Sequence, residues 1–326
     1  MKKVLFSGAL LALFALPLSA QEAPKSGKFA TFIKNIAQGI GNNDGEAVAE
    51  TEAVSATMGA ANSGLDKFED KVLSTSNFTH FELTLGSDAF GLDTGTKTKT
   101  EAMAVYRLGE TANSFTFNQT SIVSFNDRTT LNTGFGKRLI NDNDTVIFGA
   151  NVFLDYELES KHKRSGAGIE LLSSMFEWRA NVYNGISGTI KYKSIDETAL
   201  DGSDMKLTAN LPYFYSSNVY YTRGKWKDAL SLRVDTKEAG FKAEVSPNLI
   251  IGFAAMKPGK TKKIKGVASL SYSIPLGGVE QPAKAMQDGI WATKLRPIRE
   301  KLYKPVQREN RIIKKIVKLG VTVSGA

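Results

Sequence analysis

The chain has 326 residues, with 42 Lys and Arg, 33 Asp and Glu, two His and no Cys. The lack of cysteine excludes a disulfide scaffold, a thiol nucleophile and a Cys-ligated zinc site, and two histidines are too few for a His-rich metal centre. We therefore expect neither a cofactor nor an ordinary metabolic enzyme.

Residues 1–20 have the pattern of a secretory signal peptide. Lys2 and Lys3 form a basic start, residues 4–16 are apolar, and Ala20 offers a small residue for cleavage. The apolar stretch is too short to cross a bilayer, which takes about 20 residues. The sequence thus predicts an exported chain that is cleaved after Ala20.

Residues 21–76 form a lead segment that is rich in Ala, Gly, Asn, Asp and Glu and shows no strand alternation. The pieces 29–38 and 46–61 are compatible with helices. We predict a short, partly helical segment in the periplasm, and an unstructured linker is the alternative.

From residue 77 onward, polar and apolar residues alternate in segments separated by clusters of Gly, Asn, Asp, Ser and Pro. A period of two is typical of strands with one apolar face. Twelve strands are predicted, at residues 77–86, 100–109, 115–125, 129–139, 145–157, 163–172, 176–184, 203–211, 217–223, 238–245, 249–256 and 265–275.

The connections between these strands sort by length. Short turns follow the even-numbered strands, whereas four of the six connections after odd-numbered strands are longer, including 87–99 and 185–202. Outer-membrane barrels have this asymmetry, and closure satisfies every backbone group in lipid. A soluble sandwich also alternates but has no reason to sort its connections. We predict a twelve-stranded antiparallel outer-membrane β-barrel over residues 77–278, in contact with lipid and lipopolysaccharide.

Residues 279–326 form a basic tail. The stretch 281–326 contains eleven basic and three acidic residues, whereas the preceding mature chain is nearly neutral. The positive charge therefore belongs to the tail, and export argues against a nucleic-acid partner. A basic helix resting on the inner leaflet or on peptidoglycan is one interpretation of this segment.

Passage of the tail through the pore is the other interpretation. Residues 283–304 are predicted to be helical, and about 22 residues at ~1.5 Å each would cross an apolar band of ~25 Å. An even number of strands returns the chain to the side where it began. The positive charge would then pair with Asp155, Glu157 and Glu170, which the strand parity points inward.

A ladder of polar, glycine and aromatic residues runs through consecutive strands and resembles the translocator domain of the inverse autotransporters, the intimin and invasin family of Gram-negative bacteria. The ladder comprises Asp127, Arg128, Asn132, Gly134, Gly136, Arg138, Gly149, Asn151, Phe153, Asp155, Arg164, Gly166, Gly168, Glu170, Asn181 and Tyr183. A segment resembling the family's linker follows the barrel and includes Val306, Arg308, Glu309, Asn310 and Ile312.

The resemblance implies a twelve-stranded barrel that anchors in the outer membrane, with the chain after the last strand threading back through the pore. It also implies periplasmic chaperones and the barrel-assembly machinery as partners. In members of the family, the segment after the last strand displays adhesive repeats, and no such repeats are found in this sequence. We therefore expect an anchor and translocator that exports its own tail or serves a separate partner, and adhesion stays open.

Two alternatives concern chemistry. His80 or His162 could belong to a Ser-His pair of a barrel hydrolase, but no nucleophile elbow or phosphate loop is present. Asp142 and Asp144 could bind calcium, although Asp and Asn are also ordinary turn residues. We expect a non-catalytic barrel, with a porin-like barrel and a periplasmic tail as the second hypothesis.

A lysine-rich connection lies on the side predicted to face out. It contains Lys257, Lys260, Lys262, Lys263 and Lys265. Contact with lipopolysaccharide phosphates is one interpretation, and a solvated loop is equally economical.

Overall fold

The computed structural model describes residues 77–90, 97–125, 128–211, 217–227, 233–246, 248–257, 264–276 and 295–317. The chain divides into two units, 1–78 and 79–326, and nearly all described residues belong to the second. The predicted signal peptide with its cleavage after Ala20, the lead segment 21–76 and the motif residue Asp127 lie outside the described residues.

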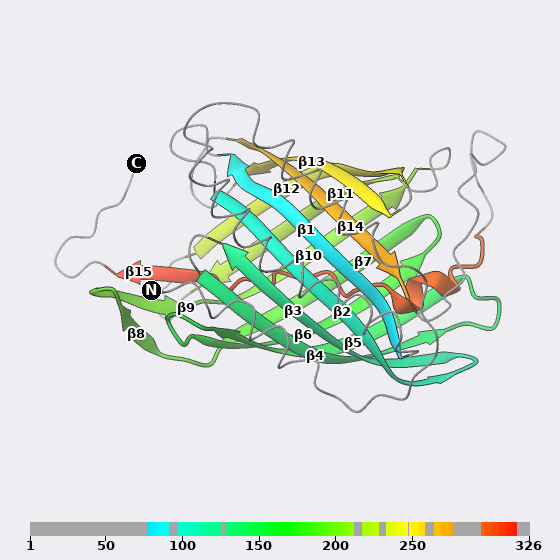
Figure 1. Ribbon diagram of the computed structural model, residues 1–326, viewed down its shortest axis with the longest axis horizontal. Helices are drawn as coiled ribbons and strands as arrows, with labels where there is room; N and C mark the ends of the chain where they lie inside the picture. Colours follow the sequence, from blue (N-terminus) through cyan, green and yellow to red (C-terminus); the bar gives the residue numbers. More distant parts are fainter. Residues whose placement is uncertain are drawn as a thin grey trace, which may run out of the picture. The chain divides into compact units, whose positions relative to one another are not determined.

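Twelve antiparallel strands close into a barrel, as predicted (Figure 1). They are β1 (Phe78–Phe90), β2 (Lys97–Thr111), β3 (Ser114–Phe125), β4 (Arg128–Ile140), β5 (Val146–Glu157), β6 (Lys163–Ser173), β7 (Phe176–Gly185), β10 (Asp201–Asn210), β11 (Ser217–Lys227), β12 (Arg233–Ser246), β13 (Leu249–Lys257) and β14 (Lys265–Pro275). Each of these strands pairs with the one that precedes it in this series. The barrel closes where β1 pairs with β14, for example through Phe81 and Ile274. Closure leaves no free edge among these strands.

The two faces of the barrel wall differ as the alternation predicts. In β5, Phe148, Val152 and Leu154 point outward and are 50–58% exposed, whereas Asn151 and Asp155 point inward and are buried. Apolar side chains outside and polar ones inside are the pattern of a barrel surrounded by lipid rather than water.

A row of alternating glycine and aromatic residues crosses six strands inside the barrel. Phe153 lies opposite Gly134, Tyr183 opposite Gly166, and Trp226 opposite Gly202 in the strand register. A Cβ atom at Gly134 or Gly202 would approach the facing ring to 2.4 or 2.2 Å. The rings therefore lie flat over the wall, and the glycines leave the centre of the lumen open.

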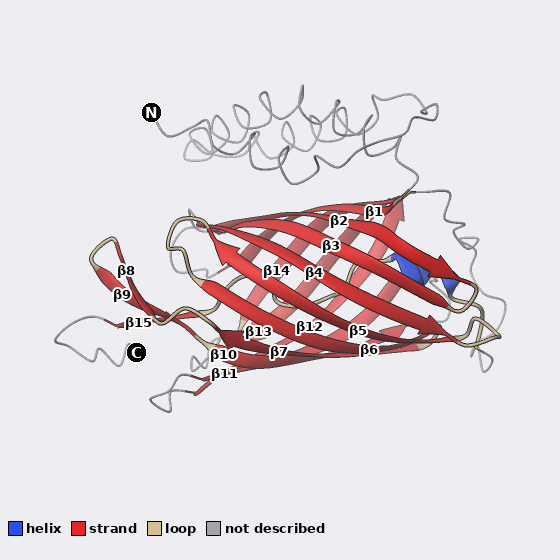
Figure 2. Cartoon of the chain, turned by 90° about the horizontal axis from the view of Figure 1, so that it is seen from below, coloured by secondary structure: helices blue, strands red, loops and turns tan. Residues whose placement is uncertain are grey.

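A small three-stranded sheet lies beyond one end of the barrel (Figure 2). It joins β8 (Thr189–Tyr192), β9 (Ile195–Ala199) and β15 (Lys314–Val317). Residues 185–202 were predicted as a plain connection, and the structure corrects this. Lys193 and Ser194 both have positive φ, 48° and 65°, which is the backbone twist of a two-residue hairpin turn.

The described part of the tail, residues 295–317, runs through the barrel from the short-turn end to this sheet (Figures 1 and 2). Its helical portion is a single 3-10 turn, η1 (Arg299–Tyr303), and residues 304–313 are extended or irregular. Residues 283–294 of the predicted helix lie outside the described residues. Pro305 explains the end of η1, because a proline restricts the preceding residue to extended conformations, and Lys304 has ψ of 153°. No helix among the described residues is long and apolar enough to cross a membrane.

Candidate functional site

The tail is fastened at the short-turn end of the barrel. Arg299 donates to both carboxylate oxygens of Asp144 in the β4–β5 turn, at 2.7 and 2.9 Å, and the Asp144 carbonyl accepts the Ile298 N–H at 2.7 Å. Lys301 Nζ donates to the carbonyl of Ser173, the last residue of β6, at 2.7 Å. Asp144 is thus engaged by the tail, and no cluster of acidic and His residues suited to a metal ion occurs among the described residues.

Arg138 receives the carbonyl end of η1. Its Nη1 donates to the carbonyl oxygens of Lys301, Leu302 and Lys304, at 3.3 and 2.8 Å for the first two. Arg138 is 1% exposed, and its charge is balanced by Glu170, whose Oε2 accepts from Arg138 Nη2 at 2.8 Å. Carbonyl groups at the end of a helical turn have no partner within the turn. The buried Arg138 guanidinium binds three of them and so holds η1 in place.

Glu170 itself contacts the barrel wall and not the tail, contrary to the expected pairing. Arg138, Gly149, Glu170 and Arg179 occupy one register row across β4 to β7. Because Gly149 has no side chain, Arg138 reaches across it to Glu170, and a Cβ there would lie 2.9 Å from Glu170 Oε2. Arg179 Nε donates to Glu170 Oε1 from the other side, at 3.1 Å.

An apolar cluster surrounds the same part of the tail. Ile298, Leu302 and Val306 are at most 1% exposed and pack with barrel residues such as Phe115 and Phe117. The Tyr303 ring contacts Phe115 edge to face, with centroids 5.0 Å apart. The tail therefore contributes to a hydrophobic core inside the barrel, which adds to its retention.

Asp155 is the main anion of the central lumen. Arg308 of the tail binds it with two parallel hydrogen bonds of 2.8 Å, and Arg164 of β6 donates to it at 2.7 Å. The Asn132 amide, oriented so that both of its ends are paired, donates to Asp155 and to the carbonyl of Asn310. Bidentate pairing of this kind fixes the register of the tail as well as its charge.

Extended tail residues beyond Arg308 bind the wall through their backbone. The Glu309 carbonyl accepts from Arg164 Nη2 at 2.6 Å, and its N–H donates to the Tyr183 hydroxyl at 2.9 Å. Tyr183 in turn donates to Asp204, which also accepts from Asn181 at 2.7 Å. Polar side chains of the wall here replace the partners that an adjacent strand would supply.

A charged cluster holds the tail at the loop end. Glu157 and Glu197 both accept from Arg128, at 2.7 and 2.6 Å, and both pair with Lys314 of β15. The backbone continues the contact, because Leu200 N–H donates to the Ile313 carbonyl at 2.9 Å. Ile312 is 4% exposed just before this point.

The structure brings most of the predicted motif residues into this system and leaves a few at its margin. Gly136 and Gly168 face Phe117 and Asn181, and a Cβ on either would lie within 2.4 Å of that side chain. Asn151 lies beside Gly168, and its amide has no hydrogen-bond partner among the described residues. A Cβ at Gly168 would lie 2.8 Å from Asn151 Oδ1, so the glycine makes room for this side chain.

Several residues of this system lie outside the predicted set, and three of them show why. Glu101 accepts from Asn310, Asp204 orders Tyr183, and Gln119 binds the backbone of Val306. All three point inward from their strands, which is the one signal that strand parity offers. Only the position of the tail distinguishes them from other lumen residues.

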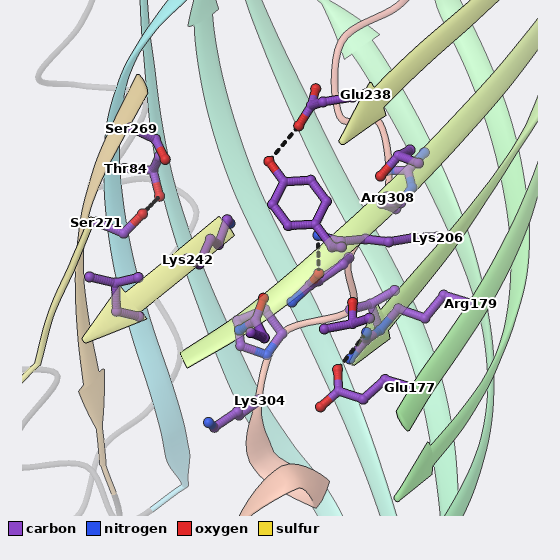
Figure 3. A pocket seen from close by; sticks show the side chains of 18 of the residues that line it. Thr84, Glu177, Arg179, Lys206, Glu238, Lys242, Ser269, Ser271, Lys304 and Arg308 are labelled. Atoms are coloured by element: carbon purple, nitrogen blue, oxygen red, sulfur yellow. Dashed lines mark hydrogen bonds and ion pairs between the residues drawn. The ribbon is translucent and has the colours of Figure 1, made fainter. Parts of the chain in front are cut away.

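A cavity of about 950 Å³ lies beside the tail (Figure 3). Its walls include inward residues of β1 and of β10 to β14. Lys206 donates to Gln307 of the tail at 2.7 Å and lies over the Tyr220 ring at 4.4 Å. Thr84 and Ser271 pair at 2.8 Å on the opposite wall. The tail therefore does not fill the lumen.

The two histidines have separate surroundings. His80 Nε2 lies 3.1 Å from Ser273 Oγ and 3.6 Å from Glu82, so the same ring nitrogen faces both groups. His162 Nδ1 is 2.8 Å from Ser187 Oγ, and its Nε2 is 4.0 Å from Glu197. Burial, with the nearby charge of Lys314, holds the pKa of His162 below its usual range.

Two solved structures are similar to this chain in fold. A chain solved in a study of the in-meso crystallization of membrane proteins is 18% identical, with a TM-score of 0.60, over 74% of this chain and all of that chain. The KdgM porin is 7% identical, with a TM-score of 0.42, over 60% of this chain and 99% of that chain. The closed wall and the apolar outer face, with the fold shared with the first of these two chains, define an outer-membrane β-barrel.

Sequence comparison then gives the family. Residues 33–310 match the model of the inverse autotransporter β-domain, and the chain belongs to this family. A putative attaching and effacing protein homolog of Escherichia coli (strain K12) is 33% identical over 111 residues, which are 33% of this chain. The match spans 37% of the length of that relative.

Proposed function

We propose that this barrel is a non-catalytic anchor and translocator of the outer membrane that carries its own C-terminal segment to the cell surface and keeps the tail in the pore. The observation that supports this proposal is the course of the tail. Arg299 binds the short-turn end, Arg308 binds the middle of the lumen, and Lys314 binds the loop end. In outer-membrane barrels the short turns face the periplasm and the longer loops face outward.

The contacts of the tail suit a permanent resident better than a passing chain. The side chains of Asp155, Arg164 and Arg308 are each at most 1% exposed, and the two guanidiniums share the one carboxylate. Loss of the tail would remove two charge-assisted hydrogen bonds from the Asp155 carboxylate, which would keep Arg164 of the wall as its partner. The wall is therefore complementary to this segment.

Cysteine labelling in intact cells tests the proposal, because the natural chain contains no cysteine. Ser324→Cys places a thiol beyond β15, and a membrane-impermeant maleimide is added before and after the outer membrane is opened. We expect full labelling on intact cells. Lys191→Cys in β8 and Asn143→Cys in the β4–β5 turn serve as the outside and inside controls.

The controls make each result informative. Export of the tail is supported if Ser324→Cys and Lys191→Cys are both labelled on intact cells while Asn143→Cys stays protected. Labelling only after the membrane is opened, as for Asn143→Cys, contradicts it. Heat-modifiable migration of all three variants verifies that the barrel is folded.

The absence of catalysis is part of the proposal. In a Ser-His-acid triad the serine and the carboxylate bind opposite nitrogens of the imidazole. His80 faces Ser273 and Glu82 with the same nitrogen, and the His162–Glu197 distance of 4.0 Å is too long for a hydrogen bond. Esterase activity that is lost in His80→Ala or His162→Ala would overturn this part.

Passage of small solutes is a second candidate function, favoured by the cavity of about 950 Å³ beside the tail. Single-channel conductance distinguishes the two. If the tail is a plug, deletion of residues 281–326 raises the conductance strongly, whereas a barrel that conducts beside its tail shows substantial conductance in the intact chain.

A further inference from the structure

A row of three basic residues crosses the outer face of β11, β12 and β13. Arg223 lies directly opposite Lys237, and Lys237 lies directly opposite Lys257. Neighbouring positions of this kind have side chains about 5 Å apart. The Arg223 side chain is 39% exposed, and Lys237 and Lys257 are exposed.

The row borders the apolar band of the barrel. On the same outer face, the next row toward the short turns consists of Tyr221, Ala239 and Ala255. The row after that consists of Val219, Phe241 and Phe253. Of these, Phe253 is 59% and Val219 43% exposed. The basic row therefore lies where apolar surface ends, at the end of the barrel that carries the β8–β9–β15 sheet.

Among the residues that the structure describes, the charges of this patch do not balance. Lys225 adds a fourth outward cation, and Asp235 is the acidic residue between them, bound by Arg223 at 2.8 Å. Like charges placed directly opposite one another destabilise a sheet. Four cations around one carboxylate, at a fixed depth and on one side of the barrel, are complementary to an external anion.

We propose that Arg223, Lys237 and Lys257 form a binding site for the phosphate groups of an outer-leaflet glycolipid, whose acyl chains lie on the apolar surface below. The site rests on the orientation in the proposed function, which turns this end of the barrel outward. Two features select a lipid over a free anion. The row is exposed at the barrel's outer wall rather than in a pocket, and apolar surface continues directly from it, so that one molecule contacts both.

Arginine and lysine have distinct parts in this site. Arg223 is held by Asp235 with hydrogen bonds of 3.2 and 2.8 Å, so its guanidinium is oriented before the lipid binds. Lys237 and Lys257 have flexible stems that lie along the apolar surface while their ammonium groups reach the phosphate level.

A lipid titration tests the site with the whole mature chain in neutral detergent. The probes are lipid A that carries both of its phosphates and lipid A from which the phosphates have been removed, with retention measured by native mass spectrometry. The variant is Arg223→Gln/Lys237→Gln/Lys257→Gln. The matched control is Lys137→Gln/Lys163→Gln/Lys191→Gln, which removes the same charge from exposed positions elsewhere.

We expect the row variant to bind phosphorylated lipid A at least ~10-fold more weakly than the natural chain, because charge-assisted contacts are lost. The control should stay within ~2-fold, and removal of the phosphates should weaken binding by the natural chain to the level of the row variant. Equal binding by the row variant and the natural chain overturns the proposal. An equal loss in both triple variants also overturns it, since it would reflect net charge alone.

Inorganic phosphate distinguishes the source of the anion. Displacement of lipid A by inorganic phosphate at a similar concentration would mean a site for free phosphate and would contradict the lipid site. Binding in detergent does not depend on which end of the barrel faces outward, whereas the cysteine labelling of residue 324 does. Failure of the lipid site and failure of the proposed export are therefore distinguishable.

Discussion

Gln119 binds both backbone groups of Val306: its Oε1 accepts the Val306 N–H at 2.7 Å, and its Nε2 donates to the Val306 carbonyl at 3.2 Å. A single amide side chain thus acts as the adjacent strand for one residue of the tail. Gln119 is 0% exposed and Val306 is 1% exposed, so water does not replace these bonds.

Gln119→Met should therefore leave two buried backbone groups of the tail unpaired, at about 1–3 kcal/mol each. The free energy of barrel unfolding in urea should fall, and amide exchange around residue 306 should speed up. Asn118→Met is the control: it removes an amide on the outer face of the same strand, which bonds Gly134 and Thr133 of β4 and Thr120 of β3 and does not bond the tail in the part of the chain that the structure describes. Similar exchange rates in both variants would show that Gln119 does not hold the tail.

Asp155→Asn should loosen the middle of the tail. The substitution leaves the buried Arg164 and Arg308 without their shared anion, which typically costs 3–5 kcal/mol. We expect the backbone amides around residue 308 to exchange faster in the folded barrel of this variant than in the natural chain, as measured by hydrogen exchange.

Combining Asp155→Asn with Arg308→Gln checks the mechanism. Because the double variant has one unpaired charge fewer, its loss of stability should be smaller than the summed losses of the single variants. Additive losses would mean that the two side chains act independently.

Gly134→Ala should disturb the wall, because a Cβ at this position would lie 2.4 Å from the buried Phe153 ring. Phe153 cannot shift freely, since the Arg308 guanidinium lies over its ring at 4.4 Å. Overpacking of this type costs about 1–3 kcal/mol. Gly109→Ala is the matched control, because nothing lies within 4 Å of the Cβ position there. The comparison is made on the heat-modification temperature, and equal temperatures would refute the steric argument.

Acid should weaken the junction between β15 and β9. His162 has a lowered pKa because it is buried and lies near Lys314, while Glu157, Glu197 and Arg128 complete its charged surroundings. A histidine whose folded pKa is depressed contributes stability that is fully present above its unfolded pKa, ~6.5, and is lost as the pH falls below that value.

Hydrogen exchange at the β15–β9 amides measures this effect. After correction for the intrinsic pH dependence, protection should be lower at pH ~5 than at pH ~7.5. The change should shrink in His162→Gln, which cannot gain a proton. An unchanged pH response in that variant would assign the effect to the carboxylates instead.

Much of the barrel followed from the sequence because its signal is local. Each strand alternates between two chemically different surroundings, so the parity of residues such as Asn151 and Val152 is visible without any partner. Strand ends were less accurate, and β10 begins at Asp201, two residues before its predicted start. At such rims both faces are polar, and the alternation fades.

The lumen contacts were only partly predictable because they depend on register between distant segments. The inward direction of Glu170 followed from strand parity. Its pairing with Arg138 instead of the tail depends on the space at Gly149, which lies between the two residues in the strand register. Gln119 and Asp204 carried no motif at all. The β8–β9 hairpin was missed because strands of four and five residues have too few positions for a period to appear.

The described part of the tail, residues 295–317, is held at both ends and in the middle of the barrel, and this has a mechanical consequence. A pull on the chain beyond β15, as from a surface-attached load, is directed along the barrel axis. Three contacts then resist the pull one after another, because the force acts along the tail and loads each of them in shear. They are the antiparallel β15–β9 pairing, the Asp155–Arg308 ion pair and the hydrogen bonds from Arg138 to the carbonyls of η1. Tension on the C-terminal segment is thus transmitted to the twelve-stranded wall, and the load would have to break all three contacts to pull the tail out of the barrel.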